Sequence, residues 1–255
     1  YNAGGALGRP LESCLWEHAL TTDLAAHGYP AAAAIAPPRE IEGQIYAVFP
    51  FLRGRIWDPL RNAGDYRRLG HLLAEYHAVA TTLPARDQRP NRFLFAHGAY
   101  PPDGLEKRAA LLERLTHLDP NLARQCAAAS DAIEPRLAAS GVRQQPLIAI
   151  HCDFSFWNLA FENGALSTVL DWDLAHMDCR ASDLAFSRRG YHDEVVRGYR
   201  EAAAISDAEV AVLDALWIAS MLGGLWRALE HEGDPSRDWL IWISEQLTKT
   251  RPYRD

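Results

Sequence analysis

The stretch that decides the fold is His-Cys-Asp-Phe-Ser-Phe-Trp-Asn at residues 151–158, followed by Asp-Trp-Asp at residues 171–173. Between them, Asn163-Gly164 separates two apolar runs. Asn-Gly is the strongest short-range signal for a β-hairpin, because both residues of its tight turn must adopt positive φ. The sequence therefore predicts a hairpin that begins after residue 158 and delivers the second acidic motif.

The predicted hairpin also indicates which side chains share a face. With the turn at residues 163–164, Asn158 would face Val169 and Phe156 would face Asp171. Asn158 and Asp171 would then be diagonal neighbours on one side, roughly 7–8 Å apart at the backbone. This spacing suits a carboxylate and an amide oxygen that hold one hard cation, with Asp153 just upstream.

Transfer of a phosphoryl group explains these residue types. The reaction needs a metal ion to neutralise developing charge, and a carboxylate to orient and deprotonate the attacking hydroxyl. Mg²⁺ prefers oxygen ligands and keeps several waters, so one Asp and one Asn are a sufficient contribution from the protein. We interpret Asp153 as the catalytic base and His151 as a residue that fixes the loop. Asn158 and Asp171 are the predicted magnesium ligands.

These motifs, with Asp178 and the later run Asp183-Leu-Ala, resemble the aminoglycoside phosphotransferase and choline kinase-like family. That family is similar to protein kinases, so the resemblance implies an α+β, protein-kinase-like fold with a small β-rich lobe and a large helical lobe. It gives the positions of Asp153, Asn158 and Asp171 the roles of base and Mg²⁺ ligands. It also gives Asp183 a structural role, in which it ties the following helix to the catalytic loop.

The resemblance divides the chain near residue 52. Residues 1–52 would form a partial, reduced nucleotide-binding lobe with the hinge, and residues 53–255 the catalytic and substrate-binding lobe. A buried strand is predicted at residues 44–51. In the family this segment is the hinge, where backbone groups near Val48, Phe49 and Phe51 would meet the adenine. The residues alone leave an ordinary core strand equally open.

One expected element is missing from the nucleotide-binding lobe. In this family a glycine-containing hairpin covers the phosphates, and a lysine on the third strand pairs with a helix glutamate. Glu17, on a helix predicted at residues 11–27, takes the place of that glutamate, but no lysine precedes it. Gly4-Gly5-Ala-Leu-Gly8 is interpreted as a loop, because its spacing matches neither glycine-rich fingerprint. The first three strands, roughly 40–70 residues, are therefore expected upstream of Tyr1.

The remainder of the chain reads as mostly helical, with a strand at residues 147–150 that delivers the catalytic loop. Helices are predicted at residues 65–80, 105–118, 122–139, 193–204, 207–230 and 237–248. The acceptor would lie between the catalytic loop and the late helices, where Asp173, Glu230 and His231 are candidate contacts. The tryptophans that accumulate there either contact the acceptor or, more commonly for such residues, pack the helices: Trp217, Trp226, Trp239 and Trp242.

Composition fits a globular enzyme. The chain has 255 residues, is 48% hydrophobic and carries a net charge of −7, which argues against a general nucleic-acid partner. The longest apolar stretch, residues 211–226, contains Asp214 and two glycines, so no membrane span is predicted. The four cysteines are scattered and indicate reduced thiols in a cytoplasmic protein. A zinc site of Cys152, His176 and Cys179 would lack a second tight pair of ligands.

The sequence therefore favours a phosphotransferase that uses ATP or GTP with Mg²⁺ and phosphorylates a hydroxyl of a small molecule, such as an aminoglycoside-, choline- or homoserine-like acceptor. A protein Ser/Thr kinase of the same superfamily is one alternative. A non-catalytic pseudokinase or nucleotide-sensing scaffold is another, because the lysine and the glycine hairpin are missing. The intact Asp153, Asn158 and Asp171 favour catalysis, since a scaffold needs no base.

Overall fold

The computed structural model describes residues 9–90, 95, 104–232 and 235–254. Its helices are α1 (Leu11–Ala26), α2 (Ala63–Ala80), α3 (Gly104–Leu118), α4 (Pro120–Ala139), α5 (Arg180–Arg188), α6 (Asp193–Ala202), α7 (Asp207–Val210), α8 (Leu213–Arg227) and α9 (Arg237–Lys249). Its strands are β1 (Arg39–Ile41), β2 (Gln44–Tyr46), β3 (Arg55–Ile56), β4 (Leu147–Ile150), β5 (Leu159–Glu162), β6 (Ala165–Val169) and β7 (His176–Cys179).

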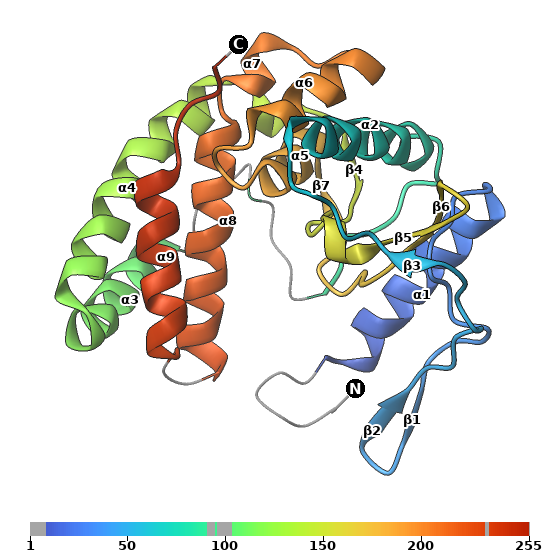
Figure 1. Ribbon diagram of the computed structural model, residues 1–255. Coiled ribbons are helices and arrows are strands. Elements are labelled where there is room, and N and C mark those ends of the chain that lie inside the picture. The colour runs from blue at the N-terminus through green and yellow to red at the C-terminus, as the bar shows by residue number, and fades with distance from the viewer. Residues whose placement is uncertain (1–8, 91–94, 96–103, 233–234, 255) are drawn as a thin grey trace.

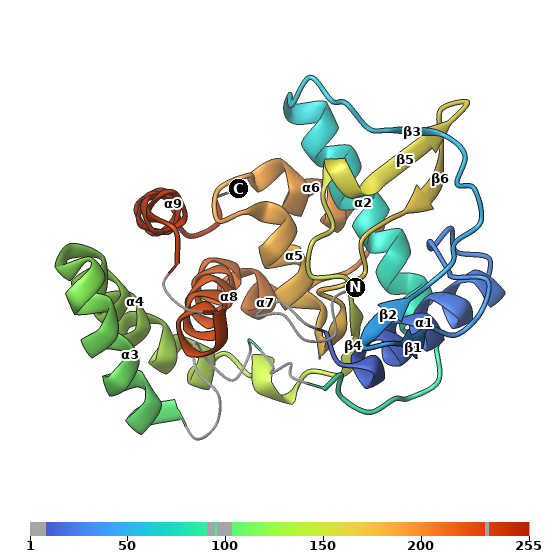
Figure 2. The same cartoon turned by 90° about the horizontal axis from the view of Figure 1, so that it is seen from below.

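The elements fall into a side with small sheets and a side built from helices (Figure 1). The hairpin β1–β2 and α1 lie together at one end, and α3, α4, α8 and α9 lie together at the other. The same separation is seen from below, with α2 and α5 between the two ends (Figure 2). None of the described helices has the length and apolar character needed to cross a membrane.

Most predicted helices are found with boundaries that differ by a few residues. Local signals explain this agreement: Asn62 forms a capping box at the start of α2, and Ser206 forms one at the start of α7. The helix predicted at residues 207–230 is instead divided. It consists of α7, then α8 after a break at residues 211–212, then a π-helical turn at Ala228–Glu232.

The predicted hairpin is present. Asn163 and Gly164 have φ of 53° and 82°, and Glu162 faces Ala165 across the turn. Strand β3 pairs with the outer edge of β5, which makes a three-stranded sheet.

The register beyond the turn differs from the prediction by one residue. A β-bulge leaves Ser167 without a partner between two pairs of the ladder, so Leu159 rather than Asn158 faces Val169. The Oγ of Ser167 donates hydrogen bonds to the carbonyls of Arg53 (3.1 Å) and Ala160 (3.0 Å) and so uses the irregular site. The predicted pairing of Asn158 with Val169 was therefore wrong, because a bulge has no signal in the apolar pattern.

The catalytic loop follows a separate two-stranded sheet. Strand β4 has the predicted bounds, and its antiparallel partner is β7, which was not predicted. Three of the four residues of β4 and all four of β7 are buried. This sheet therefore anchors both ends of the segment that contains the two acidic motifs.

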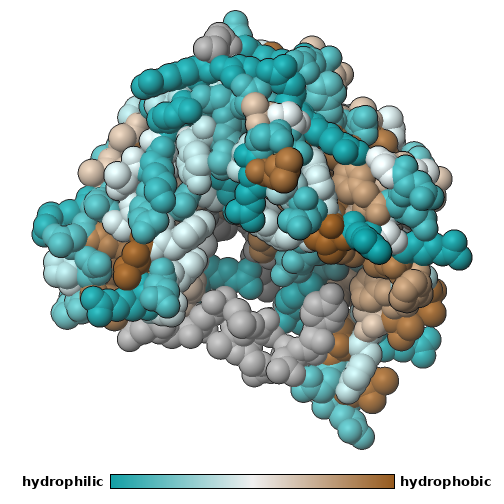
Figure 3. Space-filling model, in the orientation of Figure 1, coloured by the Kyte–Doolittle hydropathy of each residue, from teal (hydrophilic) through white to brown (hydrophobic). Residues whose placement is uncertain are grey.

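The segment predicted as a buried strand at residues 44–51 is different. Strand β2 ends at Tyr46, and Val48 and Phe51 are 60% and 93% exposed. The run of apolar residues reflects surface rather than core, and the prediction of burial was wrong. Figure 3 shows apolar side chains on the side of the molecule that carries α1 and β1–β2. Leu15 of α1 is exposed, and a longer stretch of chain adds further exposed apolar residues: Ile35, Ile41, Tyr46, Val48, Phe49, Phe51, Ile56 and Leu60.

Helices α2 and α6 cross at two glycines. A Cβ added at Gly198 would overlap the carbonyl oxygen of Arg67, and one added at Gly70 would overlap that of Val195. The two backbones therefore touch without intervening side chains, which holds α2 against the helices that follow the catalytic loop.

This contact predicts a stability effect. Gly198→Ala should lower the free energy of unfolding by about 1–3 kcal/mol, because the added methyl forces two backbones apart. Urea unfolding followed by circular dichroism measures it. Gly224→Ala in α8 is the control, since its Cβ would meet no atom within 4 Å, and it should keep or raise stability by up to about 1 kcal/mol. Equal effects of the two variants would show that the helix crossing is not tight.

Candidate active site

The catalytic loop is held by one buried carboxylate. Asp183 on α5 is fully buried, and its two oxygens accept hydrogen bonds from the backbone N–H groups of His151 and Cys152, both at 2.9 Å. The Nε2 of His77 lies 3.1 Å from the same carboxylate. Burial alone would raise the pKa of Asp183, but the hydrogen bond and charge of His77 and the contacts with His151 outweigh it and lower the pKa.

This anchoring gives the loop an uncommon backbone conformation. Cys152 has φ of 64°, a left-handed value that costs energy for a side chain other than glycine. Its N–H is one of the two backbone groups that donate hydrogen bonds to the Asp183 carboxylate. The carboxylate therefore holds the loop in a shape that the local sequence would not choose.

His151 links the loop to the end of β6. Its Nδ1 accepts from the N–H of Asp153 (3.2 Å), so the ring proton is assigned to Nε2, which donates to the carbonyl of Leu170 (2.9 Å). The ring is fully buried. The structure thus joins residues 151–153 directly to the residue that precedes Asp171.

Asp153 is surrounded by hydrogen-bond donors. Its Oδ2 accepts from Nδ2 of Asn158 (3.0 Å) and Nε1 of Trp157 (3.2 Å). Its Oδ1 accepts from Nη2 of Arg189 (2.6 Å) and from the hydroxyl of Ser155 (3.2 Å). Asn158 and Asp153, which were predicted to lie close together, are in direct contact, and the carboxylate is held in one orientation.

Arg189 was not singled out from the sequence. It ends α5 with φ of 53°, and its guanidinium lies over the rings of Trp157 and Phe186 at 4.8 and 5.0 Å. From the sequence, the arginine is noticeable only as a basic residue at the end of α5, the helix whose first turn contains Asp183. Its partner could not be identified, because Asp153 is 36 residues away in the chain.

Asp171 lies where three carboxylates come near one another. The N–H of Leu170 donates to the carbonyl of Asn158 (2.8 Å), which places Asp171 beside the end of the catalytic loop. Partial burial, the charge and hydrogen bond of Asp173 and the charge of Asp153 raise the pKa of Asp171 to about 6. The site therefore carries an excess of negative charge that a cation would relieve.

The donor set fits a hard divalent ion. A carboxylate and an amide oxygen are ligands of the kind that Mg²⁺ prefers, with water completing the shell. Within the part of the chain that the structure describes, no three His, Cys, Asp or Glu side chains are placed to hold a metal. A zinc cluster of Cys152, His176 and Cys179 therefore has no support there, and a magnesium site would rely on few protein ligands.

The residues predicted to contact the nucleotide are only partly brought together. Glu17 and Phe49 line one small cavity of about 10 Å³ between α1 and the segment after β2. The carbonyl of Val48 accepts from the N–H of Ile35 (2.8 Å), and Phe51 points to solvent.

The candidate acceptor residues are spread apart. Asp173 lies in the acidic cluster with Asp171. Glu230 is exposed on the π-helical turn after α8, and it is not among the described residues that line the larger cavities. The side chain of His231 lies outside the described residues.

Glu17 is paired, although no lysine precedes it. Its Oε2 accepts from Nη2 of Arg89 (3.0 Å) and from Arg9. The guanidinium of Arg89 is fully buried and also donates to the carbonyls of Trp172 (2.9 Å) and Ala175 (2.8 Å). One arginine therefore connects α1 with the backbone around Asp171, a connection that spans more than 70 residues and has no local sequence signal.

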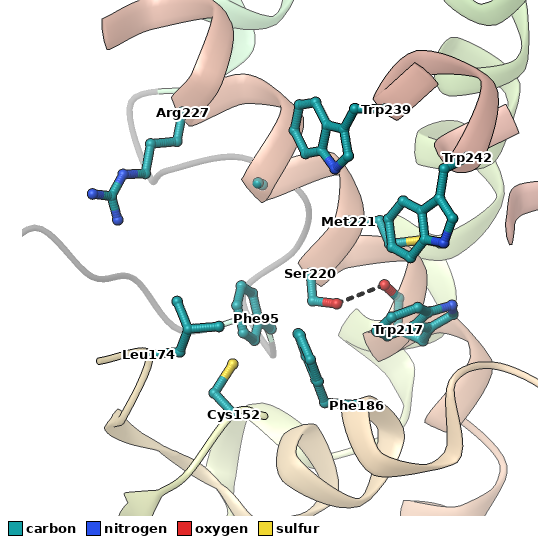
Figure 4. A pocket seen from close by; sticks show the side chains of 12 residues that line it. Phe95, Cys152, Leu174, Phe186, Trp217, Ser220, Met221, Arg227, Trp239 and Trp242 are labelled. Carbon is teal, nitrogen blue, oxygen red and sulfur yellow. Dashed lines mark hydrogen bonds between the residues drawn. The ribbon is translucent and has the colours of Figure 1, made fainter. Parts of the chain in front are cut away.

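A large apolar cavity of about 300 Å³ lies next to the catalytic loop (Figure 4). Its described lining comes from the loop, the segment before β7, α5, α8 and α9, together with one residue between α2 and α3: Phe95, Cys152, Leu174, Phe186, Trp217, Ser220, Met221, Gly223, Gly224, Arg227, Trp239 and Trp242. Helix packing was the favoured role for the four late tryptophans. Three of them, Trp217, Trp239 and Trp242, line this cavity. A second cavity of about 290 Å³, which includes Arg61, Ser155 and His192, lies on the other side of Trp242.

Replacing Asp183 should loosen the catalytic loop. Asp183→Asn keeps the size but sets an amide against a backbone N–H, so we expect a loss of about 1–3 kcal/mol at pH 7, measured by urea unfolding. The folded pKa of Asp183 is lowered, so its contribution is complete above the pKa of the unfolded chain, about 4, and is lost as the pH falls through the folded pKa. The gap between the two proteins should therefore shrink below pH 4. A gap that grows there would contradict the assignment.

Replacing Arg89 should also lower stability. Arg89→Lys retains the charge but cannot reach every acceptor, so the buried carbonyls of Trp172 and Ala175 lose partners at a cost of about 1–3 kcal/mol. Arg86→Lys is the matched control, because Arg86 donates to Asp23 (2.6 Å) near the surface. It should cost less than about 1 kcal/mol in the same denaturation measurement. Equal losses would mean that the buried contacts of Arg89 contribute little.

Comparison with solved structures identifies the fold. Amicoumacin kinase in complex with AMP-PNP, Ca²⁺ and Ami is similar at a TM-score of 0.66 and 16% identity, over 96% of this chain and 81% of that one. A microcompartment-associated aminopropanol kinase gives 0.62 and 17%, over 95% and 80%. The macrolide 2′-phosphotransferase of Brachybacterium faecium gives 0.54 and 19%, over 97% and 83%. The predicted α+β, protein-kinase-like fold is confirmed.

Among curated proteins, no sequence matches this chain. A family model described as the phosphotransferase enzyme family matches residues 5–232, which is most of the chain. This match confirms the predicted family and the predicted class of enzyme, a phosphotransferase. The chain belongs to the phosphotransferase enzyme family.

Proposed function

We propose that this protein transfers the γ-phosphoryl group of ATP or GTP to a hydroxyl of a small molecule, with Asp153 as the catalytic base. The observation that carries the proposal is the position of the Asp153 carboxylate. It is oriented by Asn158 and Arg189, it lies within electrostatic reach of Asp171, and it sits on a loop that Asp183 anchors. An oriented carboxylate beside a cation site is what in-line transfer requires.

The residues would act in a defined order. Asp153 accepts a hydrogen bond from the acceptor hydroxyl and takes its proton as the oxygen attacks the γ-phosphorus. Trp157, Asn158 and Arg189 keep the carboxylate in place during this step, since each donates to it. His151 and Asp183 would position the loop through the backbone and contact neither reactant.

Asn158 and Asp171 would hold the magnesium ion. When bound, the ion supplies positive charge to the transferring phosphoryl group and to the leaving nucleotide. Support comes from the hard oxygen donors and from the crowding of Asp171 by Asp153 and Asp173, which an ion would relieve.

The nucleotide would bind between α1 and the exposed segment after β2. The apolar side chains of Val48 and Phe49 are available there to a base, and Glu17 lies nearby with its arginine partners. Solved relatives of this fold contain AMP-PNP, ADP or GDP, which supports a nucleoside triphosphate without choosing between adenine and guanine. The division of the chain near residue 52 is part of this proposal.

A small molecule is favoured over a protein as acceptor. Cavities of about 300 and 290 Å³ flank the catalytic loop, and ligand pockets for small molecules begin at about this size. The solved relatives are kinases of aminopropanol, amicoumacin, aminoglycosides and a macrolide. The scaffold alternative is weakened because Glu17 has two basic partners, Arg89 and Arg9.

The compartment is proposed from the cysteines. All four are free and buried, which suits reducing conditions. We assign the protein to the cytoplasm. The net charge of −7 continues to argue against a nucleic-acid partner.

Removal of the base tests the proposal. Asp153→Asn should lower phosphoryl transfer by about 100- to 10,000-fold, because the amide cannot take the proton, although its oxygen can keep two of the four side-chain hydrogen bonds. ADP or GDP release is measured with a panel of small alcohols, with and without Mg²⁺. Glu162→Gln, an exposed carboxylate at the hairpin turn, is the control and should leave the rate unchanged. Undiminished transfer by Asp153→Asn would rule out the assigned base.

A further inference from the structure

The apolar cavity beside the catalytic loop has a composition that indicates its ligand. We propose that it holds the acceptor, and that the acceptor is a compact, uncharged aromatic or alicyclic alcohol rather than a polycationic aminosugar. This inference rests on the proposed function, because it names the acceptor class of that reaction. Gly224 is the position that keeps the cavity open.

The cavity lies beside the residue that precedes the base, and Asp153 itself is not among its described lining residues. Cys152, which lines it, directly precedes Asp153. Phe186 and Trp217 also line it, and the guanidinium of Arg189 lies 5.0 and 5.7 Å from the centres of these two rings. The same guanidinium donates to Asp153 at 2.6 Å. A ligand body on these rings would therefore lie near the guanidinium that donates to Asp153.

Every bond that breaks in phosphoryl transfer to such a ligand is matched by a bond that forms. The acceptor O–H bond breaks and its proton passes to the carboxylate of Asp153. An O–P bond forms to the γ-phosphorus, and the bond from that phosphorus to the bridging oxygen breaks to release the nucleoside diphosphate. Only one hydroxyl is needed, so the rest of the ligand is free to match the apolar walls.

Five of the twelve described lining residues are aromatic. Phe95, Phe186 and three tryptophans surround the space together with Leu174 and Met221, and Figure 4 shows Trp217, Trp239 and Trp242 gathered at one end of it. Burial of apolar surface contributes roughly 25 cal/mol per Å², and flat rings add favourable edge and face contacts. The volume of about 300 Å³ lies at the small end of ligand pockets, which favours a compact body.

The described lining of the cavity offers a cation no carboxylate partner. Among the described lining residues there is no Asp or Glu, and the charged one is Arg227. Aromatic rings can bind ammonium groups through their faces. Here the rings of Phe186 and Trp217 already have the guanidinium of Arg189 over them, so these two rings are already engaged by a cation of the protein.

Gly224 shows that the space is not filled by packing. It is exposed although both neighbours in α8 are buried, and a Cβ at this position would meet no atom within 4 Å. Glycine inside a helix is less favourable than alanine. No close contact requires glycine here, so its effect is to leave room for a ligand.

A matched pair of alcohols tests the ligand class. 3-Phenyl-1-propanol and phenylalaninol differ in one ammonium group, and kanamycin supplies the polycationic case. Calorimetry on the whole chain, with AMP-PNP and Mg²⁺ present, should show at least tenfold tighter binding of 3-phenyl-1-propanol than of either amine. Binding of phenylalaninol or kanamycin as tight as, or tighter than, that of 3-phenyl-1-propanol would overturn the inference.

Variants of Gly224 test the place of binding. Gly224→Leu should weaken binding of 3-phenyl-1-propanol at least tenfold, and Gly224→Ala should weaken it less, with neither lowering the melting temperature. Arg61→Asn in the second cavity is the control, since asparagine tolerates the left-handed backbone of Arg61 (φ 57°), and it should leave this affinity unchanged. Loss of affinity in Arg61→Asn but not in Gly224→Leu would move the acceptor to the second cavity and overturn the proposal.

Binding and transfer are measured separately, so two failures can be told apart. Tight binding of the alcohol without ADP or GDP release would support the chemistry of the cavity and contradict the proposed function. Phosphorylation of kanamycin without binding of the alcohol would contradict this inference and leave the proposed function intact.

Discussion

The active site depends on a single buried negative charge. An isolated carboxylate in a protein interior is costly, and Asp183 is tolerated because its oxygens accept from two backbone N–H groups and contact His77. Those N–H groups belong to the loop that carries Asp153. The need to satisfy the charge therefore fixes the loop, including the left-handed Cys152, and every proposed role of Asp153 or Asn158 follows from that shape.

Short-range features of the molecule could be predicted from the sequence. Asn163-Gly164 marks its turn directly, and β4 was found with its observed bounds. Asp153 and Asn158 lie five residues apart, so their proximity needs little knowledge of the fold. Family resemblance supplied the overall architecture and the importance of Asp183, which local patterns alone would not reveal.

Features that depend on distant residues could not be predicted. The bulge at Ser167 changes the pairing without changing the apolar pattern, and Arg189 meets Asp153 only after α5 is folded against the loop. The apolar segment at residues 44–51 was predicted as a buried strand, yet Val48 is exposed, because hydrophobicity does not reveal whether another element covers a strand. Likewise, tryptophans at helical spacing gave no indication that Gly224 leaves a space between them.

The buried guanidinium of Arg89 has a consequence for cooperativity. It contacts Glu17 on α1 and the backbone on either side of Asp173, so the helix and the acidic segment share one set of hydrogen bonds. Linkage between two sites is reciprocal. If one ligand orders the shared element and so changes the affinity for the second ligand, the second changes the affinity for the first by the same factor. If the nucleotide and the ion bind at the sites proposed above, each should therefore change the affinity of the other by the same factor.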